Sequence, residues 1–95
     1  MKPTITDNPE QSRFEAIVEG ELAGFVEYRL RDKIIDFTHT EILPAYEGKG
    51  IGSTLVRRTL DEIRSRGDRS VVATCPFVAG WIDRQQDYRA LLSTT

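Results

Sequence analysis

Apolar and polar residues alternate through the first half of the chain. Residues 13–19 and 22–30 follow this period-two pattern, and residues 34–43 are rich in β-branched and aromatic side chains. Such alternation is typical of strands that bury one face. Turn signals at residues 20–21 and 32–33 separate the three runs. The pattern therefore predicts an antiparallel meander of three strands joined by short hairpins.

The second half of the chain has the spacing of helices. One set of apolar side chains would form a single stripe along a helix: Ile51, Leu55, Val56, Thr59, Leu60 and Ile63. Gly67 is a typical C-terminal stop for this helix. Residues 70–75 are predicted to form a short buried strand. The strand–helix–strand unit implies a right-handed crossover, so this strand would lie parallel to the one before the helix.

A second helix is predicted from Pro76 to about residue 84, since proline fits the first turn of a helix. Its inward side chains would be Phe77, Val78, Trp81 and Ile82. Residues 88–92 would form a short final helix, and the polar residues 1–12 are interpreted as a leader, with or without a short strand. The predicted order is β-β-β-α-β-α, a single α+β domain over residues 1–95 with a mixed, mainly antiparallel sheet.

Composition narrows the class of protein. The 95 residues have a net charge of −2 and a pI near 5.4, which argues against a nucleic-acid-binding protein. One cysteine cannot form an internal disulfide, and one histidine with one cysteine falls short of a tetrahedral metal site. No apolar run suggests a signal peptide or a membrane span. We expect a cytoplasmic monomer that binds no metal and no nucleic acid.

Residues 47–53, Glu-Gly-Lys-Gly-Ile-Gly-Ser, are the strongest functional signal. Glycines at alternate positions let the backbone turn and approach a ligand closely. The first amides of the helix behind them have no intrahelical acceptors, so they can bind a phosphate. The loop therefore predicts a phosphorylated ligand, and the alternative is an ordinary strand-to-helix turn. The spacing excludes a nucleotide-binding P-loop.

Three short motifs, taken together, resemble one protein family. They are His39-Thr40-Glu41-Ile42 before the glycine loop, the loop itself, and Cys75-Pro76-Phe77-Val78 after the next strand. In this order, over about residues 13–92, they resemble the small single-domain branch of the GCN5-related N-acetyltransferases. The resemblance implies the acyl-CoA N-acyltransferase fold, with acetyl-coenzyme A as cosubstrate.

The resemblance also implies how coenzyme A would be held. Its pyrophosphate would bind the backbone amides of the loop, which come from Gly48, Lys49, Gly50, Ile51, Gly52 and Ser53. The pantetheine arm would pair with backbone near Ile42 and Leu43, and the thioester would lie where the neighbouring strands separate. Glu47 stands where the family has Gln or Arg. Its carboxylate could repel the pyrophosphate, and Lys49 could compensate.

Cys75 is the first candidate for catalysis. It precedes a proline, which disfavours helical geometry at the cysteine and puts it at the N-cap of the second helix. A helix N-terminus favours a thiolate, so Cys75 could accept the acetyl group and form a covalent intermediate. The alternative interpretation is a small buried side chain without a catalytic role.

His39 and Glu41 are the other catalytic candidates. They are two residues apart on one strand and therefore share a face. A neutral imidazole could take a proton from an incoming amine or from Cys75, and Glu41 could orient the imidazole. The alternatives are a structural histidine and a solvated carboxylate. Thr40 faces the other way and is expected to be structural.

The sequence thus predicts an acetyl-coenzyme A-dependent N-acetyltransferase that acetylates an amine of a protein or of a small molecule. Cys75 is the candidate carrier of the acetyl group. The alternative function is a non-catalytic module on the same fold that binds coenzyme A or another protein. Transfer or hydrolysis of acetyl-coenzyme A, beyond mere binding, would distinguish the two functions.

Overall fold

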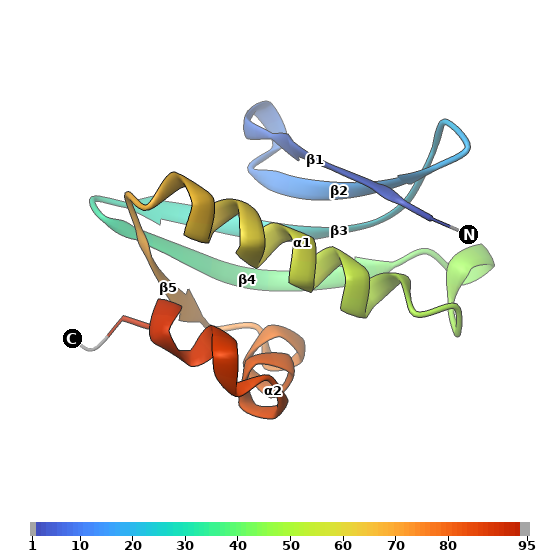
Figure 1. The fold of residues 1–95 in the computed structure, drawn as a ribbon. Coiled ribbons are helices and arrows are strands. Elements are labelled where there is room, and N and C mark those ends of the chain that lie inside the picture. Colours follow the sequence, from blue (N-terminus) through green and yellow to red (C-terminus); the bar gives the residue numbers. More distant parts are fainter. Residues whose placement is uncertain (1, 94–95) are drawn as a thin grey trace.

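Five strands form one sheet in the computed structural model, which describes residues 2–93 (Figure 1). The strands lie in chain order across the sheet: β1 Thr4–Asn8, β2 Arg13–Val18, β3 Glu21–Arg31, β4 Ile34–Ile42 and β5 Ser70–Ala73. Neighbours from β1 to β4 are antiparallel, whereas β5 is parallel to β4. The predicted α+β fold with a mixed, mainly antiparallel sheet is confirmed.

The described residues form two α-helices: α1, Ile51–Arg66, follows β4, and α2, Pro76–Arg84, follows β5. Helix α1 connects the parallel strands β4 and β5 and lies across one face of the sheet (Figure 1). It ends at Gly67, which adopts the left-handed conformation and donates its amide to the Ile63 carbonyl, as the sequence predicts. Three short 3₁₀ helices complete the fold: Pro9–Gln11, Pro44–Tyr46 and Gln86–Leu91. Among residues 2–93, none of the helices combines the length and apolar character that a membrane crossing needs.

The core lies between the sheet and the two helices. All six apolar positions predicted for α1 are buried. Val78, Trp81 and Ile82 of α2 are buried as well, and the rings of Trp81 and Tyr88 meet edge to face with centroids 4.9 Å apart. Phe77, predicted to point inward with them, is 42% exposed instead. A helix of nine residues has one inner stripe, and Val78, Trp81 and Ile82 already fill it.

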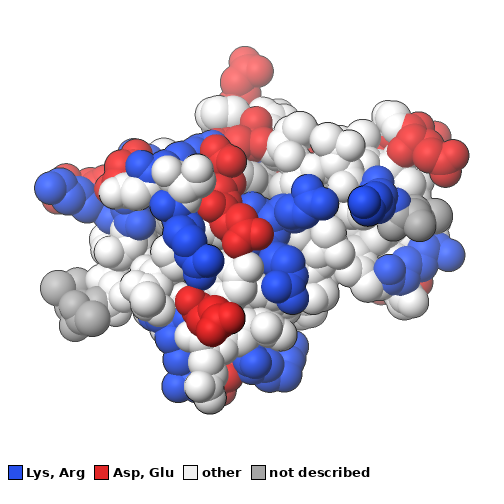
Figure 2. All heavy atoms as spheres, viewed as in Figure 1, with Lys and Arg blue, Asp and Glu red and all other residues white. Residues whose placement is uncertain are grey.

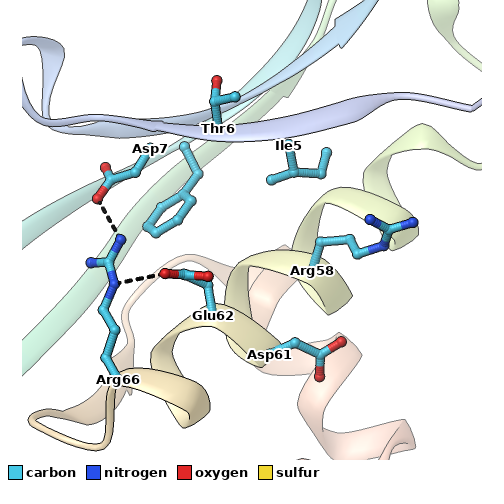
Figure 3. Close-up of a pocket in the computed structure, with 8 residues that line it drawn as sticks. Ile5, Thr6, Asp7, Arg58, Asp61, Glu62 and Arg66 are labelled. Carbon is cyan, nitrogen blue, oxygen red and sulfur yellow. Dashed lines mark hydrogen bonds and ion pairs between the residues drawn. The ribbon is translucent and has the colours of Figure 1, made fainter.

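The polar leader contains a strand that the predicted element order lacks. Strand β1 pairs along its length with β2, and its Ile5 packs against the core. Asp7 accepts a hydrogen bond from the Tyr28 hydroxyl at 2.7 Å. It also accepts one from the Arg66 guanidinium of α1 at 3.0 Å (Figure 3). Burial and the bond to Asp7 raise the pKa of Tyr28, so its hydroxyl stays protonated and remains a donor. Tertiary contacts therefore hold β1 where its own sequence pattern is weak.

One residue of β4 interrupts the ladder with β3. Glu27 lies opposite His39 and Tyr28 lies opposite Phe37, so Thr38 has no partner on β3. Such a bulge shifts the alternation of side chains by one position. Ile35 and Phe37 point into the core before the bulge, whereas Thr40 and Ile42 take that face after it. His39 and Glu41 consequently lie on the outer face, and both are exposed.

We predict that Asp7→Ala destabilises the fold by detaching β1 from α1. The substitution leaves the part-buried Tyr28 hydroxyl without its acceptor and removes the ion pair to Arg66. The free energy of unfolding should fall by about 1–3 kcal/mol, measured by urea denaturation. Asp68→Ala is the matched control, since Asp68 is exposed and pairs with its neighbour Arg69, and it should change the value by less than ~0.5 kcal/mol. Equal stability of the two variants would contradict this role of Asp7.

Candidate functional site

A pocket of about 340 Å³ lies at the glycine loop. It joins the end of β4, the loop, the first turn of α1 and the first turn of α2. The residues that line it are Ile42, Tyr46, Glu47, Gly48, Gly50, Ile51, Gly52, Ser53 and Phe77. The pocket therefore contains most of the residues that the sequence predicts to bind a cofactor, together with Phe77, which was not among them.

The loop backbone has the geometry that anion binding requires. Gly48 and Gly50 both have φ of 76°, in the left-handed region that favours glycine. Gly50 is the N-cap of α1 and provides no side-chain cap, and the first intrahelical bond runs from the Thr54 amide to the Gly50 carbonyl. The amides of the first turn therefore have no intrahelical acceptors and lie at the positive end of the helix dipole.

The charged residues of the loop differ in position. Glu47 is part of the pocket lining, whereas Lys49 is exposed and is not. The pocket lining therefore does not include the lysine that was expected to offset the repulsion between the Glu47 carboxylate and a pyrophosphate. A phosphorylated ligand would be held by backbone amides, with the Glu47 carboxylate nearby.

Gly52 allows α1 and α2 to meet at the pocket. A Cβ added at this position would lie 3.0 Å from Cζ of Phe77 and 3.6 Å from Cγ1 of Ile42. The exposed ring of Phe77 therefore rests against the start of α1. Trp81 is one turn further along α2, and its indole N–H donates to the Ser53 hydroxyl at 2.9 Å. A hydrophobic residue directly after the helix-opening Pro76 is the sequence signal that could have indicated Phe77 as a pocket residue.

Ile42 and Leu43 differ in what they can offer to a ligand. Ile42 lines the pocket and is half-buried. Leu43 donates its amide to the Ala23 carbonyl at 2.8 Å, and its carbonyl accepts the Tyr46 amide at 2.8 Å. Because the Leu43 amide is already bonded to β3, the predicted pairing with a pantetheine arm would depend on Ile42 and on the remaining lone pair of the Leu43 carbonyl.

Cys75 marks the point where β4 and β5 separate. The last residue pair between these strands is Phe37 with Ala73, and the Cys75 amide then donates to the Phe37 carbonyl at 2.8 Å. Beyond this point β4 continues to Ile42, while the chain after Cys75 turns into α2. Cys75 is extended, with φ −68° and ψ 122°, and is the N-cap of α2, as the sequence predicts. Its side chain is buried, with 4% exposed.

Thr40, rather than His39, is the residue of the His-Thr-Glu motif that meets Cys75. The Thr40 hydroxyl lies 3.4 Å from the Cys75 sulfur. His39 and Glu41 face the opposite side of β4, where their side chains are 55% and 51% exposed and lie 3.3 Å apart. In this arrangement His39 does not reach Cys75, because the bulge at Thr38 reverses the alternation on which the expected cleft position depended. A role for His39 or Glu41 in catalysis stays a prediction.

A larger pocket, of about 460 Å³, lies between β1 and α1 (Figure 3). Three of its charged side chains form a cluster, in which Arg66 contacts Asp7 at 3.0 Å and Glu62 at 3.0 Å. No residue of the glycine loop lines this pocket, so we place the candidate site at the smaller one. Within residues 2–93, no three His, Cys, Asp or Glu side chains gather as metal ligands would.

Solved structures that are similar to this chain include several acetyltransferases. A GCN5-like protein from Staphylococcus aureus matches with a TM-score of 0.71 and 19% identity, over 97% of this chain and 89% of that chain. A GNAT-family acetyltransferase from Brucella melitensis, in complex with acetyl-CoA, matches with 0.61 and 24%, over 77% of this chain and 50% of that one. The ribosomal-protein-S18-alanine N-acetyltransferase from Escherichia coli matches with 0.64 and 17% over the same shares. The chain spans about half the length of the last two proteins.

These likenesses confirm the predicted acyl-CoA N-acyltransferase fold. Among curated proteins, none matches the sequence. A family model described as GCN5-related N-acetyl-transferase matches residues 13–91, which include the glycine loop, Thr40 and Cys75. The chain therefore belongs to the GCN5-related N-acetyltransferase family, whose enzymes move an acetyl group from acetyl-coenzyme A to an amine.

Proposed function

We propose that this N-acetyltransferase binds coenzyme A at the glycine-loop pocket and passes the acetyl group to an amine through Cys75. The observation that carries the proposal is the uncapped N-terminus of α1, which opens into the pocket beside Phe77. Phosphate groups are suited to free amides at a helix N-terminus. The left-handed glycines Gly48 and Gly50 leave this backbone open to close approach, and the missing Cβ of Gly52 makes room for the Phe77 ring beside it.

The residues of the loop would bind the pyrophosphate through the amides of Gly48, Lys49, Gly50, Ile51, Gly52 and Ser53. Ile42 and Phe77 would supply apolar contacts to the pantetheine arm. The arm would then extend from the pocket toward the point where β4 and β5 separate, at which Cys75 lies.

The covalent route consists of two acyl-transfer steps. In the first, the Cys75 thiolate attacks the carbonyl carbon of the acetyl thioester, a new Sγ–C bond forms and the bond to the coenzyme A sulfur breaks. The departing coenzyme A thiolate takes up the equivalent of the proton that Cys75 lost. In the second, the amine attacks the acetyl carbon, an amide forms, and the Cys75 sulfur leaves and takes up a proton that the amine releases.

The acceptor is an amine of a protein or of a small molecule. Solved relatives of this fold differ in this respect: one is an acetyltransferase of an alanine of a ribosomal protein, and another is an aminoglycoside acetyltransferase. On this chain, His39 and Glu41 lie on the outer face of β4, where they could contact an acceptor that approaches from that side.

We predict that Gly52→Ala weakens binding of coenzyme A at least about tenfold, which corresponds to ~1.4 kcal/mol. The added methyl group would press on Phe77 and occupy space at the start of α1. Isothermal titration calorimetry with coenzyme A measures the effect. Gly80→Ala on α2 is the matched control, because a Cβ there meets only the Arg84 guanidinium, at an ordinary 3.5 Å. If Gly52→Ala binds as tightly as Gly80→Ala, the pocket is not the coenzyme A site.

We predict that incubation with acetyl-coenzyme A adds one acetyl group to Cys75, detected by the intact mass of the protein and by peptide mapping. Cys75→Ala should show no adduct and should lose most acetyl transfer to an amine, while it still binds coenzyme A. Retention of full transfer by Cys75→Ala would instead show that the amine attacks the thioester directly. The coenzyme A affinity of the variant is the control, since the loop that binds the pyrophosphate is unchanged.

A further inference from the structure

We propose that Thr40 is a positioning residue for Cys75, whose hydroxyl holds the cysteine sulfur and stabilises its thiolate by a hydrogen bond. The inference rests on the proposed role of Cys75 in acetyl transfer. It assigns a function to a residue that the sequence pattern indicated as structural.

The geometry of β4 and α2 brings the two side chains together. Thr40 Oγ1 and Cys75 Sγ lie 3.4 Å apart, although the two residues are 35 positions apart in the sequence. Thr40 is half-buried and Cys75 is buried, so solvent has little access to the contact. The bulge at Thr38 is what turns the Thr40 side chain toward Cys75.

The hydrogen bond can serve both forms of the cysteine. A threonine hydroxyl both donates and accepts and can rotate to suit its partner. It can accept from the neutral thiol and donate to the thiolate. Hydrogen bonds to an ionised partner are about twice as strong as neutral ones, so the contact favours the thiolate.

The ionisable groups on the surrounding elements make other contacts. Asp36 of β4 accepts the Thr74 amide at 3.4 Å and lies 3.7 Å from Arg31. His39 and Glu41 pair with each other on the opposite face of β4.

The charged groups near the glycine loop and on α1 also have other neighbours. Glu47 lines the glycine-loop pocket, and Arg57 of α1 lies over the Trp81 ring. In the described part of the chain, Thr40 is the only side chain found within hydrogen-bond distance of the Cys75 sulfur.

The test compares Thr40→Val, which keeps the shape and removes the hydroxyl, with Thr40→Ser, which keeps the hydroxyl. Cys75 is the only cysteine, so its rate of alkylation by iodoacetamide can be measured on the whole protein over a range of pH. Thr40→Val should shift the profile to higher pH and slow alkylation at neutral pH by roughly tenfold or more. Thr40→Ser should stay close to the parent protein.

Thr59→Val of α1 is the matched control, since Thr59 is also a buried threonine and its hydroxyl contacts no hydrogen-bond partner in the described part of the chain. It should leave the alkylation profile unchanged. Coenzyme A affinity should also be unchanged in Thr40→Val, because the glycine loop is not altered. Should Thr40→Val fail to fold, Thr40→Ala serves in its place, with the same expected shift.

An alkylation profile of Thr40→Val or Thr40→Ala that matches the parent protein would overturn the role of Thr40. This result is distinct from failure of the proposed function. If the profile shifts but no acetyl adduct forms on Cys75 in the parent protein, Thr40 still stabilises the thiolate and the covalent route is wrong. If the adduct forms equally fast in Thr40→Val and in the parent, the route stands and Thr40 has no part in it.

Discussion

The bulge at Thr38 is the constraint on which the candidate site depends. Strand β4 contributes core residues up to Phe37 and site residues after Thr38. Because Thr38 is unpaired, each later side chain of β4 lies on the opposite face from the one that regular alternation would give it. Without it, regular alternation would turn His39 inward with Phe37 and turn Thr40 outward. The contact between Thr40 and Cys75 exists because the strand changes phase at the place where its partner β5 ends.

The two ends of α1 have different roles. On the side of β1, Asp7, Tyr28 and Arg66 tie strands to the second half of α1 through short hydrogen bonds. On the side of the glycine loop, the first turn of α1 has no side-chain cap and Phe77 is exposed. The stabilising polar contacts and the ligand-binding backbone are therefore kept apart along one helix, so the loop can leave its amides open while the fold is held elsewhere.

The sequence predicted elements well where one local pattern decided them. The bounds predicted for α2, Pro76 to about residue 84, agree with the structure because Pro76 determines where the helix starts. Of its predicted inward residues, only Phe77 is exposed. Two features had no such pattern. Strand β1 is mostly polar, and its position depends on contacts of Asp7 with residues far along the chain. The bulge at Thr38 cannot be recognised in the sequence, because the residues around it still alternate as they would in a regular strand. The motifs thus indicated the right segments, but which face each side chain took, and hence the partner of Cys75, required the three-dimensional register.

The charge of the protein limits how it can attract coenzyme A. The net charge of −2 gives no overall attraction for an anion, and Figure 2 shows basic and acidic side chains interspersed over the face that it displays. Glu47 in the pocket lining adds a repulsion at close range. Attraction must then come from the amides at the start of α1, whose dipoles act over short distances and favour an anion only when it comes close. Because close approach is what Gly48 and Gly50 permit, affinity should depend on the backbone geometry of the loop more than on Lys49.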